Sequence, residues 1–264
     1  MGHAYTPSAA ATPRGENQPD LRTEEIAVAR ADLAACFRMA ARNGFEEGIC
    51  NHFSAMVPGH DDLFLVNPYG LAFREITASS LLICDFHGAV IDGEGEPEAT
   101  AFHIHAQMHR LVPRARVAFH THMPYATALS MSDEDPLIFA GQTALKFYGR
   151  TAYDRDYNGL ALDDREGERI AKACGDADII FMKHHGVMVL APTIAEAWDD
   201  LYYLERAAQV QCIALSTGRK IDAVSHDIAS AAVALMREGD PDSARLHLAS
   251  LRRTLDRQEP EYAA

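Results

Sequence analysis

Apolar and polar residues follow two different periodicities along this chain, and segments of the two kinds alternate. Helices are predicted where apolar residues recur on one side of a helix or where a capping residue opens the segment, at 23–43, 98–111, 163–174 and 193–216. Strands are predicted where apolar or β-branched runs are short, at 53–57, 63–66, 81–86, 89–91, 115–122, 179–182 and 187–190. The chain is therefore expected to contain helices and strands in comparable number.

The remaining segments are shorter or less regular. They are predicted to form a helix at 126–131, a strand at 137–140, a loop at 148–159, and two helices at 227–238 and 242–255. Residues 1–21 are rich in Ala, Pro, Ser and Gly with few large apolar side chains, so we expect a flexible extension there. Neither an internal repeat nor a linker follows, so residues 22–264 are expected to form a single domain.

The composition indicates which classes of binding partner are excluded and in which cellular compartment the protein is expected. The chain has 264 residues, and 38 acidic against 24 basic residues give it a formal net charge of -14. Such a field repels phosphates, so neither a nucleic acid nor an anionic membrane is expected as a partner. Five scattered cysteines form no C-x-x-C pair, and we find neither an apolar run of membrane-spanning length nor a signal peptide. These features predict a cytoplasmic protein with reduced thiols.

Histidines at two strand ends carry the most specific chemistry in the sequence. His120 and His122 lie two residues apart in a predicted strand, so both side chains face the same side of it. Two imidazoles on one face form half of a transition-metal site. A third ligand is suggested at the end of a later strand, where His184 and His185 come just before Gly186.

The predicted helix 98–111 carries three further histidines, His103, His105 and His109. His105 and His109 are one helical turn apart and could in principle hold a metal. Such histidines more often pack at a helix face or a subunit contact, and we interpret them in that way.

Motifs spread over residues 23–218 resemble, in the same order, those of the class II aldolase/adducin family. The matching segments are Gly48-Ile-Cys-Asn51-His-Phe-Ser54, Asn67-Pro-Tyr-Gly70, Ile76-Thr77 with Asp85, His120-Thr-His122, His185-Gly186, and the helix that holds Glu196 and Ala197. The resemblance implies an α/β fold, a three-layer α/β/α sandwich around a mainly antiparallel sheet. It also implies a homotetramer with active sites near the subunit interfaces.

Carried over residue by residue, the resemblance implies two sets of site residues. The ligands of a divalent metal would be His120, His122 and His185. The substrate contacts would be Asn51, Ser54, Asn67 and Gly70. Three neutral imidazoles with one open position suit catalysis, with zinc expected as the metal and Fe(II) or Mn as alternatives.

Two departures from the family pattern bear on the substrate and on the acid/base. The glutamate that family aldolases use as acid/base falls on Ala101 here, and Glu98, one helical turn earlier, is a substitute whose ordinary role would be to favour the helix N-terminus. The family's phosphate-binding serines are replaced by Glu96-Pro97-Glu98, and carboxylates there would repel a phosphate. Tyr125 and Tyr153 are the other candidate proton carriers.

The sequence supports three hypotheses of function. The first is a metal-dependent lyase that performs a retro-aldol or decarboxylation reaction on a small non-phosphorylated carbonyl compound or oxo acid, because both reactions pass through an anion that a metal stabilises. The second is a non-haem iron oxygenase of the kind that shares this fold in aminocoumarin pathways and also lacks the usual acid. The third is a non-enzymatic, adducin-like binding or assembly module.

Overall fold

The computed structural model describes residues 20–264, so the predicted extension at 1–21 lies almost wholly outside the described part. One eight-stranded sheet has the order β4-β3-β2-β1-β5-β8-β7-β6. The strands are β1 His52–Met56, β2 Leu63–Val66, β3 Leu82–Asp85, β4 Val90–Asp92, β5 Val117–Thr121, β6 Thr151–Asp154, β7 Ile179–Met182 and β8 Gly186–Ala191. Among these strands only β6 and β7 pair in parallel. The predicted mainly antiparallel sheet is confirmed.

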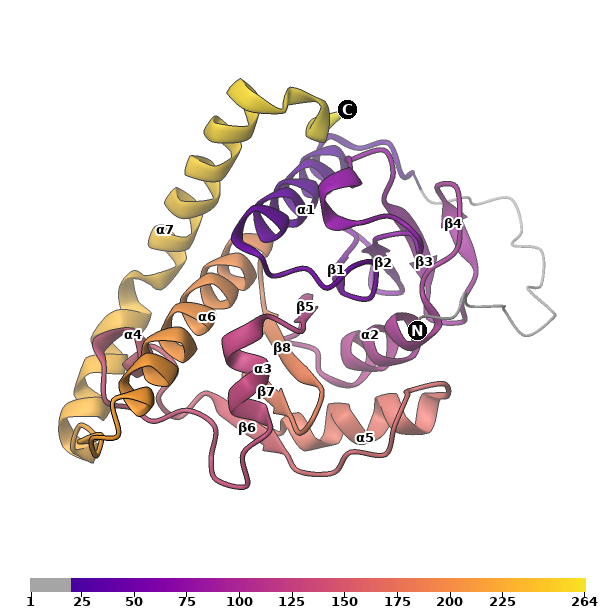
Figure 1. Cartoon of the computed structure of the whole chain (residues 1–264). Helices are drawn as coiled ribbons and strands as arrows, with labels where there is room; N and C mark the ends of the chain where they lie inside the picture. Colours follow the sequence, from indigo (N-terminus) through magenta and orange to yellow (C-terminus); the bar gives the residue numbers. More distant parts are fainter. Residues whose placement is uncertain (1–19) are drawn as a thin grey trace.

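Helices cover both faces of this sheet, which completes the predicted three-layer sandwich (Figure 1). The α-helices are α1 Glu24–Asn43, α2 Ala99–Leu111, α3 Pro124–Ser130, α4 Gln142–Leu145, α5 Asp164–Cys174, α6 Ile194–Ser216 and α7 His226–Gln258. Two short 3-10 helices, η1 Phe73–Glu75 and η2 Pro260–Ala263, complete the described elements. None of the helices in residues 20–264 is long and apolar enough to cross a membrane.

The two faces of the sheet bury different sets of side chains because strand residues alternate between them. On one face, Phe53 of β1 and Phe119 of β5 stack with ring centroids 4.0 Å apart and join the core that includes Trp198 of α6. On the other face, α2 and α5 pack together over β5, β7 and β8 through a separate apolar cluster. His52 and His120, a cross-strand pair one position from Phe53 and Phe119, consequently face α2.

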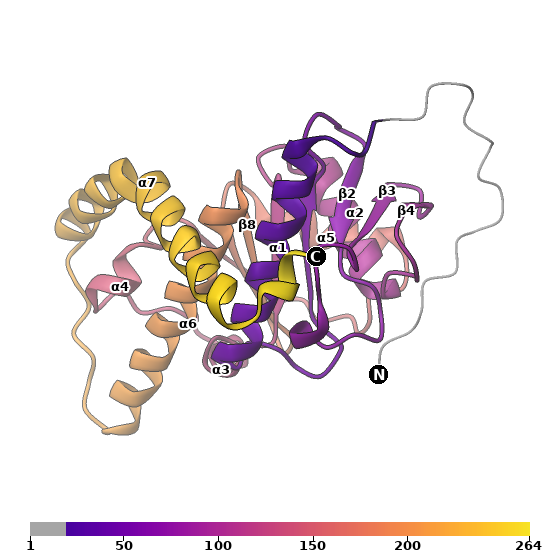
Figure 2. The ribbon, with the colours of Figure 1, turned by 90° about the horizontal axis from the view of Figure 1, so that it is seen from above.

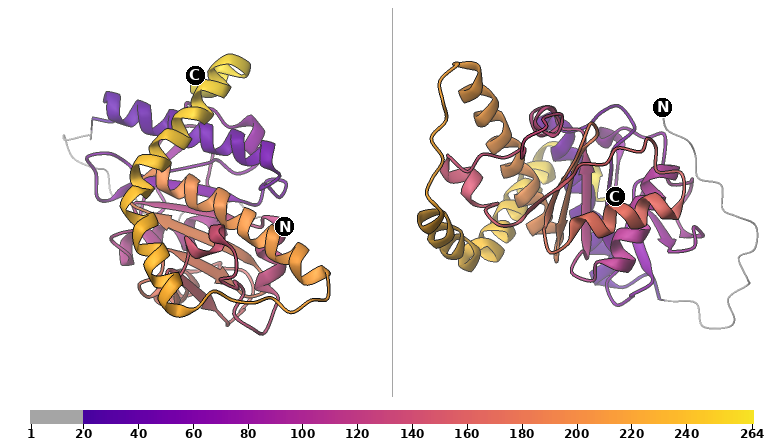
Figure 3. Two further views of the ribbon diagram at one scale, coloured as in Figure 1. Left: turned by 90° about the vertical axis from the view of Figure 1, so that its left-hand side faces the viewer. Right: turned by 90° about the horizontal axis from the view of Figure 1, so that it is seen from below.

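The C-terminal region differs from the prediction, because one long helix replaces the two predicted at 227–238 and 242–255. Pro241 lies inside α7, where it removes one backbone hydrogen bond. Tertiary contacts stabilise the continuous helix: Asp240 pairs with the buried Lys146 at 2.8 Å, and the residues Ala244, Leu248, Leu251 and Leu255 that follow are buried. α7 contacts both α6 and α1, and Figures 2 and 3 show its C-terminal end lying beside α1.

Two other local predictions are wrong. Residues 137–140 form no strand, because their backbone is bonded elsewhere: Ile138 N–H donates to the side chain of Gln211 at 2.7 Å, and Phe139 C=O accepts from Val224 N–H at 2.9 Å. The segment 148–159, predicted as a loop, contains the edge strand β6. That strand forms by parallel pairing with β7, a partner 28 residues away in register.

Candidate metal centre

Three imidazoles from two distant chain segments meet at one edge of the sheet. His120 belongs to β5, His122 follows it directly, and His185 comes just before β8, the strand that pairs with β5. One nitrogen from each of the three lies within 4.8 Å of the other two. The sequence-predicted ligand set is therefore brought together, although its assignment to a metal stays a prediction.

Hydrogen bonds fix the tautomers of His120 and His122. Nδ1 of His120 lies 2.9 Å from the carbonyl oxygen of Val187, which can only accept, so this nitrogen carries the proton. Nδ1 of His122 likewise donates to the carboxylate of Glu47. In the neutral form of each ring Nε2 then carries a lone pair, and the two Nε2 atoms face each other at 3.1 Å. Two facing lone pairs repel each other, and a cation between them removes the repulsion. The residues present therefore fit a divalent metal.

The third imidazole is positioned by a tight turn with unusual backbone geometry. His184 adopts φ 59°, the left-handed region that few non-glycine residues occupy, and this turns the chain from β7 into β8. Gly186 then lies so close to β5 that a Cβ atom there would be 2.6 Å from the carbonyl oxygen of Thr121 and 2.9 Å from Cδ2 of His122. Only glycine allows β8 to approach the metal-ligand pair at this distance.

A Gly186→Ala substitution is expected to destabilise the protein by about 1–3 kcal/mol, because its Cβ must displace the β5 backbone or the His122 ring. Zinc affinity should fall with it. Urea unfolding and a zinc titration measure the two effects. Gly141→Ala is the matched control, since a Cβ at Gly141 would meet no atom of residues 20–264 within 4 Å. Equal behaviour of the two variants would contradict the close approach.

A chain of polar contacts supports His122 from outside. The carboxylate of Glu47 accepts from its Nδ1, the backbone N–H of Glu47 donates to Oδ1 of Asn51 at 2.8 Å, and Nδ2 of Asn67 donates to the backbone carbonyl of Asn51 at 3.2 Å. Asn51 and Asn67 are both buried, and within residues 20–264 Nδ2 of Asn51 and Oδ1 of Asn67 have no hydrogen-bond partner. These two unpaired atoms are compatible with contacts to a ligand, and the role of both residues in substrate binding stays a prediction.

Replacing Glu47 with glutamine is expected to weaken zinc binding about tenfold, because the amide is a poorer acceptor for the His122 Nδ1 proton. Changing a carboxylate that orients a metal-binding histidine typically lowers metal affinity by about 10–100-fold. We expect the smaller value here, because the Glu47 side chain is 66 % exposed and solvent screens its charge. Competition with a fluorescent zinc chelator measures the change. Glu94→Gln, in an exposed turn, serves as the control; zinc affinity unchanged by E47Q would exclude a role for this carboxylate.

The three candidate proton carriers lie in different surroundings. Glu98 is buried at the N-terminus of α2, where its Oε2 accepts from Ala101 N–H at 2.8 Å and from the Thr100 hydroxyl. Tyr125 and Tyr153 both pack against the core on the other side of the sheet, and the Tyr153 hydroxyl lies 3.0 Å from the Ser130 carbonyl. Of the three, Glu98 is on the side of the sheet that carries the histidines.

Two predicted substrate contacts occupy contrasting positions. Gly70 adopts φ 98° in the turn after Pro68, and a Cβ there would meet no described atom within 4 Å. Ser54, by contrast, is fully buried under α2, and its hydroxyl lies 2.5 Å from Nδ1 of His105 and 2.7 Å from Nε2 of His109. The role of each in substrate binding stays a prediction.

Sequence reasoning missed the extent of this histidine cluster. His52, His105 and His109 are fully or almost fully buried beside the sheet, and burial lowers the pKa of His52 to about 3 and that of His109 to about 4. His105 and His109 are buried at the face of α2 that packs on the sheet, and their neighbours there are polar. The i, i+4 spacing of His105 and His109 is a sequence signal for this cluster, but it does not indicate their partners His52 and Ser54 on β1.

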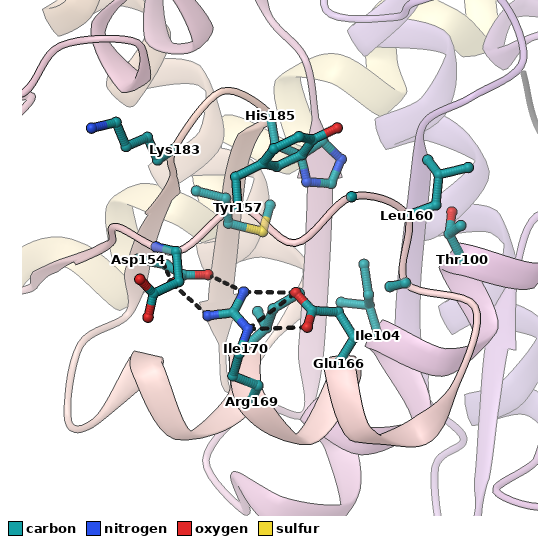
Figure 4. A pocket seen from close by; sticks show the side chains of 14 residues that line it. Thr100, Ile104, Asp154, Tyr157, Leu160, Glu166, Arg169, Ile170, Lys183 and His185 are labelled. Carbon is teal, nitrogen blue, oxygen red and sulfur yellow. Dashed lines mark hydrogen bonds and ion pairs between the residues drawn. The ribbon is translucent and has the colours of Figure 1, made fainter.

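A small cavity opens beside His185, between α2, α5 and the segment after β6 (Figure 4). Apolar side chains of Ile104, Leu160, Ile170 and Met182 form much of its lining. Its charged side holds Arg169, which pairs with Asp154 at 2.7 and 2.8 Å and with Glu166 at 2.8 Å. Two carboxylates therefore neutralise the guanidinium, and the cavity offers little net positive charge to an anion.

Comparisons with known proteins show which family the chain is similar to. The sequence model described as the class II aldolase and adducin N-terminal domain matches residues 31–212. A Caulobacter vibrioides protein provisionally named an aldolase class 2 protein is 39% identical over 192 residues, covering 72% of this chain and 74% of the relative. A Streptomyces roseochromogenus protein named 4-hydroxy-3-prenylphenylpyruvate oxygenase/4-hydroxy-3-prenylbenzoate synthase is 31% identical, covering 75% and 72%.

Two solved structures extend the likeness to almost the whole chain. An aldolase II superfamily protein from Pseudomonas syringae has a TM-score of 0.86 and 30% identity, with 93% of this chain and 98% of that one covered. L-fuculose 1-phosphate aldolase from Glaciozyma antarctica has a TM-score of 0.79 and 25% identity, with 93% and 96% covered. The predicted fold is confirmed by these neighbours.

Proposed function

Because the chain belongs to the class II aldolase and adducin family, we propose that it is a zinc-dependent lyase acting on a small, non-phosphorylated oxo or hydroxy acid. The observation that carries this proposal is the pair of unprotonated Nε2 atoms of His120 and His122, 3.1 Å apart, with His185 beside them. Zinc held by these three side chains would supply a Lewis acid, which suits retro-aldol cleavage or decarboxylation because both develop negative charge on a substrate oxygen.

The protein's own part is to hold the three ligands in place and to leave room for the substrate. Val187 and Glu47 orient two of the rings, and the glycine at 186 sets the distance to the third. A metal held by these three side chains would remain open to a substrate ligand. Asn51 and Asn67 contribute the unpaired amide atoms that would bind its polar groups.

The charges around the site support a substrate without a phosphate. Glu98 is a buried carboxylate 3.9 Å from Nε2 of His52, on the side of the sheet that carries the ligands. Arg169, the nearby guanidinium in the cavity beside His185, is already paired with Asp154 and Glu166. A phosphate dianion would be repelled by the Glu98 carboxylate, and the paired Arg169 would not offset this repulsion. Glu98 is also the group that we propose as the proton carrier.

The test is a screen of short oxo and hydroxy acids, with and without a phosphate, for cleavage or loss of CO₂ by zinc-loaded protein. The expected result is turnover of a non-phosphorylated compound that disappears on chelation and in the Glu98→Gln variant. Turnover of sugar phosphates alone, or turnover that survives complete chelation, would contradict the proposal.

A second candidate follows from the Streptomyces relative, whose name describes an oxygenase of a prenylated phenylpyruvate. The three imidazoles present here do not select between zinc and ferrous iron. The matching experiment is oxygen uptake by iron-loaded protein with an arylpyruvate. Uptake that requires ferrous iron and is lost with zinc would favour the oxygenase over the lyase.

A further inference from the structure

Four polar side chains form an unbroken hydrogen-bonded chain in the layer between the sheet and α2. Nδ1 of His52 lies 3.2 Å from Nε2 of His105, whose Nδ1 lies 2.5 Å from the hydroxyl of Ser54. That hydroxyl lies 2.7 Å from Nε2 of His109, and Nδ1 of His109 lies 2.6 Å from the carbonyl oxygen of Ala115. All four side chains are at most 6% exposed.

The Ala115 carbonyl determines the direction of every bond in this chain. A carbonyl can only accept, so Nδ1 of His109 carries a proton. Its Nε2, 2.7 Å from the Ser54 hydroxyl, accepts from that hydroxyl in preference to the Ala118 carbonyl, which is 3.4 Å away. The Ser54 oxygen then accepts from Nδ1 of His105, and Nε2 of His105 accepts from Nδ1 of His52. His52 is therefore fixed with its proton on Nδ1, and its Nε2 is left for another partner.

His52 lies beside His120, one of the candidate metal ligands. His52 pairs with His120 across β1 and β5, and the two rings stack with centroids 5.0 Å apart. Oε2 of Glu98 is 3.9 Å from Nε2, too far for a hydrogen bond, and no other group among residues 20–264 bonds to this nitrogen. A proton on Nε2 would thus be unsatisfied in a buried place, whereas a lone pair there can accept from a ligand.

We propose that His52 is a further substrate-binding residue, whose Nε2 accepts a hydrogen bond from a hydroxyl group of the substrate next to the metal ligands. Ser54, His105 and His109 are its positioning residues, because they hold the proton on the opposite nitrogen. This inference rests on the proposed function for the identity of the ligand. The donor and acceptor roles along the hydrogen-bonded chain from His52 to His109 follow from the hydrogen bonds alone and do not depend on that function.

The tautomers are measured by long-range ¹H–¹⁵N NMR on metal-free protein with ¹⁵N-labelled histidine. The expected result is a protonated Nδ1 and an unprotonated Nε2 on His52, His105 and His109 at neutral pH. A proton on Nε2 of His52 overturns the inference. This experiment needs neither zinc nor turnover, so its outcome is independent of the lyase proposal.

Ligand recognition is tested on zinc-loaded protein with glycolate and acetate, which differ by one hydroxyl group. Glycolate should shift the Nε2 resonance of His52 and bind about tenfold more tightly than acetate, as one added hydrogen bond predicts. The same shift with both acids, or with neither, overturns the role of His52 as a hydroxyl acceptor.

The positioning role is tested with Ser54→Ala, which interrupts the chain. Its matched control is Ser130→Ala, because Ser130 is equally buried and, among the described residues, its hydroxyl bonds only to the Thr127 carbonyl of the same helix. Ser54→Ala should give His52 a mixture of tautomers and remove the tenfold preference for glycolate, while zinc content stays at the parent level. A variant that keeps the single tautomer and the preference overturns the positioning role.

Discussion

Replacing His122 with alanine is expected to lower zinc affinity by at least 10³-fold and to abolish lyase turnover. Structural zinc contributes roughly 10–16 kcal/mol when four ligands bind it, so one of three protein ligands carries several kcal/mol. His122 is partly exposed at the end of β5, which makes the substitution tolerable for folding. Isothermal titration with zinc and the activity screen measure the two effects in the same preparation.

The matched control is His184→Asn. His184 is adjacent to the proposed ligand His185 but is exposed, and its ring lies against Tyr157 with centroids 6.2 Å apart. Asparagine tolerates the left-handed backbone that His184 adopts, so the turn is preserved. Zinc affinity should remain that of the parent in this variant. Equal loss in both variants would mean that the turn, and not the His122 ligand, accounts for the effect.

The metal-free protein is expected to lose stability steeply on mild acidification, because buried histidines stay neutral in the folded state. Burial lowers the pKa of His52 to about 3 and of His109 to about 4, while unfolded histidine titrates near 6.5. Below pH 6.5 the unfolded chain binds protons that the folded protein does not, so the free energy of unfolding falls as pH falls. Above pH 6.5 this contribution is fully present.

Each of these two histidines lowers the free energy of unfolding by about 1.4 kcal/mol for every pH unit below 6.5. Together they lower it by about 3 kcal/mol per pH unit, until His109 also becomes protonated in the folded state near pH 4. Urea unfolding at pH 7.5, 6.5, 5.5 and 5.0 measures the slope. The His109→Gln variant cannot titrate at this position and should show a slope smaller by about one proton. Constant stability between pH 6.5 and 5 would contradict buried, neutral histidines.

The candidate metal ligands could be identified by sequence reasoning because their geometry is local. His120 and His122 face one side of β5 through the two-residue period of a strand, and His185 is identified by its place at a strand end before a glycine. The family resemblance then supplied the sheet and the layers. None of this required knowledge of which helix packs on which strand.

The histidine chain was not accessible in the same way. The spacing of His105 and His109 shows that they share a helix face, but their partners Ser54 and His52 lie about 50 residues away on β1. The contact depends on how α2 is rotated and seated over the sheet, which local patterns do not specify. Sequence reasoning accordingly placed Ser54 with the substrate, and the structure places its hydroxyl among imidazoles.

Long-range contacts also explain the errors in secondary structure. Pro241 locally favours a break, yet the Asp240–Lys146 ion pair and the buried leucines beyond it keep α7 continuous. The short β6 strand exists because β7 pairs with it. The division at residue 22, the homotetramer and the cytoplasmic location stay predictions.

A crystal structure of zinc-soaked protein, with anomalous data on both sides of the zinc edge, tests the central claim most directly. We predict one anomalous peak per chain, about 2.0–2.1 Å from a ring nitrogen of each of His120, His122 and His185. No peak at this position in protein exposed to excess zinc, or a peak held by other residues, would contradict the metal centre and the lyase chemistry built on it.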